Sequence, residues 1–145
     1  MKRTILFPAL LLAGIAIVAA CSPASPLSVT AVRSNACSAG DDCGVFMTIA
    51  NAAKEDDTLI GVASTVAERT QLHTVVKGDD GNMKMTPIEN VVVPASGSVE
   101  LKPGSYHVML LTLNRELKEG ETFPLTLKYA KAGEMTLQVN VQPAT

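Results

Sequence analysis

Apolar and polar residues alternate in short runs along most of the chain, and turn-forming residues separate these runs. The run from Thr122 to Tyr129 is the clearest example, because Phe123, Leu125, Leu127 and Tyr129 fall on one side of it. This alternation is typical of a strand that buries one face. From residue 27 onward, no stretch sustains apolar residues at helical spacing over three turns. The pattern therefore predicts an all-β domain.

Ten strands follow from this pattern, with turns rich in Gly and Pro between them. Many short strands at this spacing predict an immunoglobulin-like Greek-key β-sandwich. The strands are expected at Leu27–Arg33, Val45–Asn51, Thr58–Ala63, Thr70–Val76, Met83–Pro87, Val91–Val93, Ser98–Leu101, His107–Leu113, Thr122–Tyr129 and Glu134–Val141.

The N-terminal segment differs from the rest of the chain. Lys2 and Arg3 precede an uncharged apolar run that ends at Ala20, which indicates a signal peptide over residues 1–20. A membrane-spanning helix is disfavoured because Cys21 and a Ser/Pro-rich stretch follow the run directly. The junction Val18-Ala19-Ala20-Cys21 resembles the bacterial lipobox, whose cysteine carries diacylglycerol after cleavage; ordinary signal cleavage is the alternative.

This organisation predicts three parts: a signal peptide (1–20), a lipidated Cys21 with a short tether (21–26), and one β-sandwich domain (27–145). The protein is expected in the bacterial cell envelope, anchored to a membrane by lipid on the periplasmic side. After cleavage, the chain holds ten basic and fourteen acidic residues, a net charge of −4. Nucleic acid is not an expected partner, because phosphate binding needs clustered Lys and Arg.

Cys37 and Cys43 remain once Cys21 is lipidated. An exported compartment is oxidising, so a disulfide between them is the first interpretation. A metal role for this pair fits less well, since their spacing matches neither a zinc knuckle nor a Cys-x-x-Cys redox motif.

The candidate chemistry lies in the two histidines of the chain, which both occur near methionines. His107-Val108-Met109 puts an imidazole and a thioether on one face of a strand, because side chains alternate with a period of two. Met83-Lys84-Met85 has the same spacing, and a hairpin over the Asp79–Asn82 loop would bring its strand beside that of His73.

Each of these residues alone has a plain structural explanation, as core filler or as a hydrogen-bonded histidine. If they converge, their softness selects the metal: thioether sulfur and imidazole nitrogen suit Cu(I), whereas zinc and calcium prefer other donors. No cysteine is placed beside them to make a blue-copper site. The pattern therefore favours copper transport over electron transfer.

The spacing of these residues resembles the signature H-x10-M-x21-H-x-M of the periplasmic copper chaperones called PCu(A)C. Twenty-one residues separate Met85 from His107, and Met109 completes the motif. Eleven residues separate His73 from Met85, one more than the signature, and we place the extra residue in the Val76–Asn82 turn. The wider resemblance covers Gly44–Asn51, Gln71–His73, Val99–Leu110 and Leu117–Leu127.

The resemblance implies a cupredoxin-like β-sandwich with an exposed copper site and no enzyme activity. It implies Cu(I) ligands at His73, Met85, His107 and Met109, with Met83 as a neighbour or substitute; Met47 and Met135 are assigned to the core. The implied partners are the CuA-containing subunit of cytochrome c oxidase, a Sco-type thiol copper protein, or both.

Two alternative functions stay open at this point. Copper buffering or resistance needs the same ligands as delivery, so the sequence does not separate them. A metal-free structural β-sandwich lipoprotein is the other. A hydrolase is disfavoured, because no Ser-His-Asp or nucleophile-elbow pattern accompanies the histidines.

Overall fold

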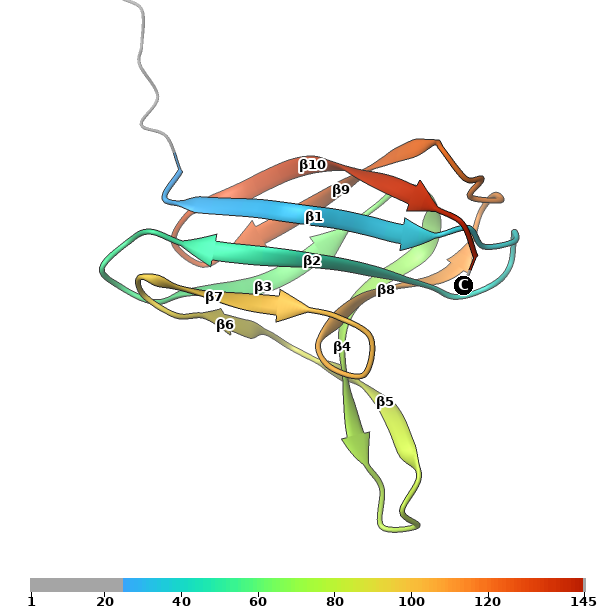
Figure 1. Ribbon diagram of the computed structural model, residues 1–145, viewed down its shortest axis with the longest axis horizontal. Coiled ribbons are helices and arrows are strands. Elements are labelled where there is room, and N and C mark those ends of the chain that lie inside the picture. Colours follow the sequence, from blue (N-terminus) through green and yellow to red (C-terminus); the bar gives the residue numbers. More distant parts are fainter. Residues whose placement is uncertain (1–24, 145) are drawn as a thin grey trace, which may run out of the picture.

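The computed structural model describes residues 25–144, so the predicted signal peptide and the lipidated Cys21 lie outside the described residues. Figure 1 shows a β-sandwich with one hairpin that projects from it. The ten strands are β1 (Leu27–Asn35), β2 (Cys43–Asn51), β3 (Asp57–Ala63), β4 (Ala67–Lys77), β5 (Met83–Ile88), β6 (Val91–Val93), β7 (Gly97–Leu101), β8 (His107–Leu113), β9 (Thr122–Tyr129) and β10 (Gly133–Gln142).

The all-β prediction is confirmed, and each of the ten predicted strands is present. The largest difference is at β4, which begins at Ala67 rather than Thr70. These extra residues pair with the end of β8, where Ala67 lies opposite Leu113 and Arg69 opposite Leu111. Pairing with a distant strand thus extends β4 beyond its own apolar run. Within residues 25–144, no helix is long and apolar enough to cross a bilayer.

The strands form one sheet in the order β5-β4-β8-β2-β1-β10-β9-β3-β6, with β7 on β2. The sheet curves back on itself, so that β1, β2 and β10 face other strands across the core (Figure 1). Several neighbours are far apart in the chain, such as β2 with β8 and β3 with β9, and β1 pairs with β10 in parallel. These are Greek-key connections of the predicted kind.

Alternation along the strands fills the core. In β2 every second residue is buried, from Cys43 through Val45, Met47 and Ile49 to Asn51. Phe123, Leu125, Leu127 and Tyr129 of β9 are buried in the same way, as the sequence pattern predicted. Met47 is a core residue, and Met135 packs against the core from a partly buried position. All buried core residues lie between Leu27 and Val141.

β7 and β8 follow one another along the same edge of β2. Met47 of β2 lies opposite Leu101 of β7, while Val45, two residues away, lies opposite Val108 of β8. The residues between Leu101 and His107 therefore loop out of the sheet, and the Lys102 N–H donates to the Tyr106 carbonyl across the base of that loop, at 2.8 Å. The loop returns the chain to the sheet at His107.

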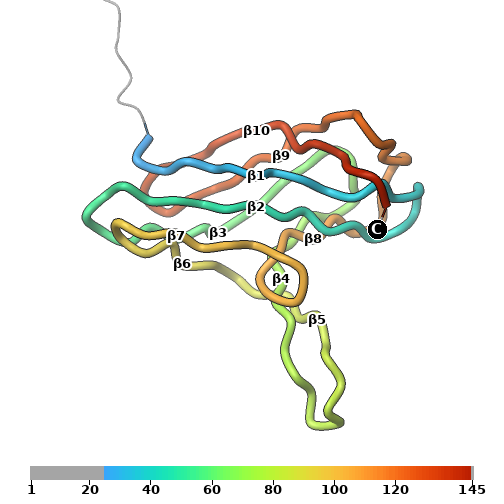
Figure 2. Tube along the Cα trace, in the orientation of Figure 1, coloured from blue at the N-terminus to red at the C-terminus, as the bar shows by residue number. Residues whose placement is uncertain are grey.

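The β4–β5 hairpin extends away from the sandwich (Figures 1 and 2). Its loop closes with an N–H···O bond from Gly78 to the Asn82 carbonyl, at 2.7 Å, and a second from Gly81 to the Gly78 carbonyl. Gly81 has φ of 82°, which the bulged end of a three-residue hairpin loop requires. The ladder from Leu72–Ile88 to Lys77–Met83 has no register shift, so the loop leaves both strands regular.

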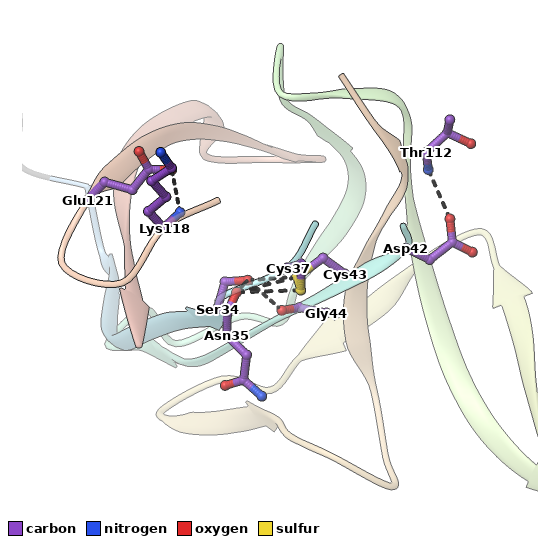
Figure 3. The surroundings of a disulfide bond; sticks show 9 residues. All are labelled: Ser34, Asn35, Cys37, Asp42, Cys43, Gly44, Thr112, Lys118 and Glu121. Carbon is purple, nitrogen blue, oxygen red and sulfur yellow. Dashed lines mark hydrogen bonds between the residues drawn. A yellow bond between two sulfur atoms is a disulfide. The ribbon is translucent and has the colours of Figure 1, made fainter. Parts of the chain in front are cut away.

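A disulfide joins Cys37 to Cys43 at the start of β2, with a Cα–Cα distance of 6.3 Å (Figure 3). Next to it, the Asp42 carboxylate accepts the Thr112 N–H at 2.9 Å. Thr112 has φ of 55°, which interrupts its pairing with β4 and turns its N–H toward Asp42. The disulfide therefore fixes a loop that contacts β8 directly.

Candidate metal centre

The ladders of β4, β5 and β8 bring both histidines and three methionines to one face of the sheet. His73 lies opposite His107, and Gln71 opposite Met109, in the antiparallel β4–β8 pair. Residues opposite each other in such a pair project to the same face, as do residues two apart along a strand. In β5, Met85 lies opposite Val75 and Met83 opposite Lys77, both on the His73 face of β4.

The other face of these strands packs on the core. Leu72, Val108 and Leu110 are 4% exposed or less, and they alternate with the candidate ligands. This apolar face holds the ligand strands against the sandwich. The two imidazoles are themselves buried, with His73 8% and His107 4% exposed, and their ring centroids lie 5.8 Å apart.

Each imidazole uses one nitrogen for a hydrogen bond and leaves the other without a partner. His107 Nδ1 lies 2.9 Å from the Ser105 carbonyl oxygen, to which it donates, and His73 Nε2 lies 3.2 Å from Gln71 Oε1. The opposite nitrogens, His107 Nε2 and His73 Nδ1, are buried with no hydrogen-bond partner in the described part of the chain. Buried polar atoms are normally paired, so these two nitrogens are candidate metal-ligating atoms.

Such hydrogen bonds are a usual feature of metal-binding histidines, because they fix the tautomer and the ring orientation. The contact of His73 with Gln71 was not expected from the sequence. Gln71 stands two residues before His73 on the same face of β4, which is the one signal that would have indicated it.

Methionine sulfur completes the donor set. Met85, His107 and Met109 line one open depression of about 250 Å³, together with residues of β2 and of the β7–β8 loop. His73 does not line it and lies beside His107 on the neighbouring strand. Met85 is 61% exposed, so a metal held there would lie at the surface. Two imidazoles and two thioethers are the neutral, soft donors that Cu(I) favours.

Met83 is on the same face as Met85 but does not line the depression. It is 62% exposed and lies nearer the tip of the hairpin. In residues 25–144, no group of three or more His, Cys, Asp or Glu side chains has the arrangement of a metal site.

Phe46 forms one wall of the depression, a role that was not expected from the sequence. Its ring centroid is 6.4 Å from that of His107, and the Arg33 guanidinium lies 5.7 Å from the centre of the ring. The ring passes directly over Gly44, where an added Cβ would stand 2.9 Å from Phe46 Cζ. Gly44 therefore provides the space that lets this ring lie against the candidate site.

Burial lowers the pKa of His73, and the neighbouring His107 lowers it further, while the charge of Asp42 acts in the opposite direction. A lowered pKa keeps the imidazole neutral near pH 7. A neutral imidazole binds metal without first losing a proton.

Comparison with known proteins identifies the family of this chain. Residues 16–141 match a family described as "Putative lipoprotein LpqE-like". One curated relative, "Putative lipoprotein Lxx21020" of Leifsonia xyli subsp. xyli, is 25% identical over 97 residues, which cover 67% of this chain and 58% of the relative. The chain thus spans less than two thirds of that protein's length.

Two solved structures resemble the fold closely. The copper-bound PCuAC domain from PmoF2 aligns with a TM-score of 0.69 and 24% identity, over 82% of this chain and 94% of that domain. The Cu(I) form of DR1885 from Deinococcus radiodurans aligns with a TM-score of 0.59 and 31% identity, over 82% and 81%. The architecture is therefore that of a PCuAC-type β-sandwich, with the cupredoxin-like fold predicted above. The chain belongs to the LpqE-like family.

Proposed function

We propose that this protein is a copper carrier of the cell envelope, which binds one Cu(I) through His73, Met85, His107 and Met109. The observation that carries the proposal is the pair of buried nitrogens, His73 Nδ1 and His107 Nε2, which have no hydrogen-bond partner among residues 25–144 and lie on the face that also holds the methionines. The copper in the related PmoF2 and DR1885 structures supports it.

The arrangement suits transfer better than permanent storage. The histidines are buried and oriented by hydrogen bonds, whereas Met85 is exposed. An incoming donor would therefore reach the ion from the methionine side, displacing thioethers before imidazoles. We further propose that the recipient is the CuA centre of cytochrome c oxidase, directly or through a Sco-type thiol protein. Copper buffering is the competing function, and the two differ only in whether a recipient takes the metal.

A Cu(I) competition titration tests the binding. The protein from Ser22 to Thr145, which contains the whole buried core, is titrated without oxygen against a Cu(I) chelator of known affinity. Met85→Ala/His107→Ala is compared with Met135→Ala, whose methionine lies outside the depression. We expect one Cu(I) per chain in the parent and in Met135→Ala, and its loss in the double variant. No competition by the parent would leave a metal-free lipoprotein.

We also propose the lipid anchor at Cys21 and a periplasmic location. The lipoproteins that the chain resembles support this. Expression of Cys21→Ser beside the natural sequence tests it. We expect the natural protein in the membrane fraction with incorporated fatty acid, and the variant without the lipid; a membrane-free natural protein would exclude the anchor.

A further inference from the structure

A carboxylate lines the candidate metal site, and the proposed ligand set does not use it. Asp42 lines the depression together with Met85, His107 and Met109. Of the described residues that line it, Asp42 is the one acidic residue, and none is Lys or Arg. A negative charge therefore stands at the place where a cation is expected to bind.

The loop that carries this carboxylate is fastened to β8. Asp42 Oδ1 accepts the Thr112 N–H at 2.9 Å, as Figure 3 shows. Beside this bond, the Gly40 N–H donates to the Leu113 carbonyl at 2.8 Å, and the Leu113 N–H donates to the Asp41 carbonyl at 3.0 Å. The disulfide described above closes the same loop. Asp42 is exposed, but these bonds keep its side chain in one place.

The backbone of Thr112 is adapted to this attachment. Its φ of 55° lies in the left-handed region, which β-branched residues rarely adopt. Such conformations persist only where their surroundings hold them, and they cluster at functional sites. The fold thus maintains a costly conformation where Asp42 joins the strand that carries His107 and Met109.

The proposed ligands leave the charge of the metal uncompensated. Two neutral imidazoles and two thioethers give a Cu(I) complex with one positive charge, and His73 and His107 are almost fully buried. A cation beside buried groups is costly unless an opposite charge lies near it. Within residues 25–144, no Lys or Arg forms an ion pair with Asp42. The Arg33 guanidinium lies over the Phe46 ring and does not line the depression.

The field of this carboxylate reaches the imidazoles. Burial and the neighbouring His107 lower the pKa of His73, whereas the charge of Asp42 opposes both effects. The carboxylate therefore favours positive charge at His73. A cation held by the same imidazole would be favoured in the same way.

We propose that Asp42 is the counter-ion of the bound Cu(I): it raises the affinity of the site through its charge and does not ligate the metal. This inference rests on the proposed copper-carrier function. In the described part of the chain, no three His, Cys, Asp or Glu side chains are arranged as a metal site, which agrees with a role without ligation. Because the carboxylate is exposed, its effect is moderate and is screened by salt.

The salt dependence of the Cu(I) affinity tests this role. Asp42→Asn removes the charge and keeps an oxygen that can accept the Thr112 N–H. Parent and variant, from Ser22 to Thr145, are titrated without oxygen against a Cu(I) chelator in sodium sulfate, because chloride itself binds Cu(I). The ionic strengths are about 0.01 M and about 1 M, between which the Debye length falls from about 30 Å to about 3 Å.

We expect Asp42→Asn to bind Cu(I) about fivefold more weakly than the parent at low salt, the effect of two unit charges in close contact in a water-like dielectric. At high salt the two affinities should be equal. The ratio of variant to parent cancels the effect of salt on the chelator. A merely structural role of Asp42 would give a loss that salt does not change.

Asp41→Asn is the matched control. It removes the same charge from the adjacent residue of the loop, which is exposed and does not line the depression. We expect it to lower the affinity by less than about twofold at low salt. Urea unfolding without copper checks the loop, and both variants should unfold at nearly the urea concentration of the parent.

Three results would each overturn the counter-ion proposal: equal affinities of parent and Asp42→Asn at low salt, a loss that persists undiminished at high salt, or an equal loss in Asp41→Asn. In all three the parent still binds one Cu(I), and the carrier function stands. No binding by the parent would instead overturn the carrier function, so the two failures are distinguishable.

Discussion

His73 and His107 lie directly opposite each other in the β4–β8 ladder, with ring centroids 5.8 Å apart, and each ring keeps one buried nitrogen without a partner in the part of the chain that the structure describes. His73 belongs to the first strand of the projecting hairpin, and His107 begins β8, later in the chain. One hydrogen-bonded ladder therefore sets the distance between the candidate nitrogen ligands, and the adjoining β4–β5 ladder sets the position of Met85 relative to them.

The first prediction concerns the residue that orients His73. Gln71→Leu removes the acceptor 3.2 Å from His73 Nε2 and leaves the strand intact. Loss of such a supporting group typically lowers metal affinity 10- to 100-fold, so we expect a drop of about that size in the Cu(I) competition titration. In long-range nitrogen–proton NMR spectra, we expect His73 of the parent to carry its proton on Nε2 and the variant to populate both tautomers.

Gln138→Leu is the matched control, because Gln138 is an exposed β10 residue outside the depression. An unchanged affinity and tautomer in Gln71→Leu would show that Gln71 does not position the imidazole.

The second prediction concerns the aromatic wall. Gly44→Ala places a Cβ 2.9 Å from Phe46 Cζ, so the ring has to move away from its place beside His107. Crowding of this kind costs about 1–3 kcal/mol. Because the ring also covers one side of the depression, we expect air to oxidise the bound Cu(I) faster, as followed by the appearance of the Cu(II) EPR signal.

Gly61→Ala is the control for this change. Its added Cβ would lie at an ordinary 3.7 Å from Lys128, so its stability and oxidation rate should stay near those of the parent. The double variant Gly44→Ala/Phe46→Leu should recover part of the lost stability, since the smaller side chain relieves the contact. It should still oxidise quickly. Slow oxidation in Gly44→Ala would mean that the ring does not shield the metal.

The sequence predicted the strands well because their alternation is local, and the spacing of His107 and Met109 placed two candidate ligands on one face. Which residues lie opposite each other on neighbouring strands does not follow from local alternation. His73 meets His107, and Met85 meets Val75, through register between strands, which depends on the hairpin loop and on the packing of Leu72 and Val108. The hydrogen bond to Gln71 lies within β4, where the two-residue spacing from His73 is its only sequence signal, and the wall formed by Phe46 depends on the pairing of β2 with β8.

The third prediction separates a structural from a metal role for the cysteines. The Cys37–Cys43 disulfide closes a short loop, and a loop of this length stabilises the fold by about 2 kcal/mol in the chain-entropy model. We expect Cys37→Ala/Cys43→Ala to lose about that amount in urea unfolding. Neither cysteine lines the depression, so the variant should still bind one Cu(I). Loss of the copper with the fold intact would assign these cysteines to the site.

The last prediction concerns a buried carboxylate outside the candidate metal site, whose contribution to stability depends on pH. Asp57 is 5% exposed, and its oxygens accept the backbone N–H groups of Thr58, Lys131 and Ala132 at 2.7 to 2.9 Å. Burial alone would raise the pKa of Asp57, but these three hydrogen bonds and the charge of Lys131 together lower it. The folded protein therefore holds this proton less tightly than the unfolded chain.

The stability that Asp57 contributes depends on pH. Stability contributed by Asp57 is present above the unfolded pKa of about 4 and is lost as pH falls through the lower folded pKa. Asp57→Asn keeps an oxygen for two of the amides but turns an NH₂ group toward the third. We expect a loss of about 1.5–3 kcal/mol at pH 7 that shrinks as pH falls below about 4, measured by urea unfolding at each pH. Asp79→Asn, an exposed residue, should change little at any pH. A loss in Asp57→Asn that stays constant down to pH 2 would show that packing, and not the carboxylate charge, holds this turn.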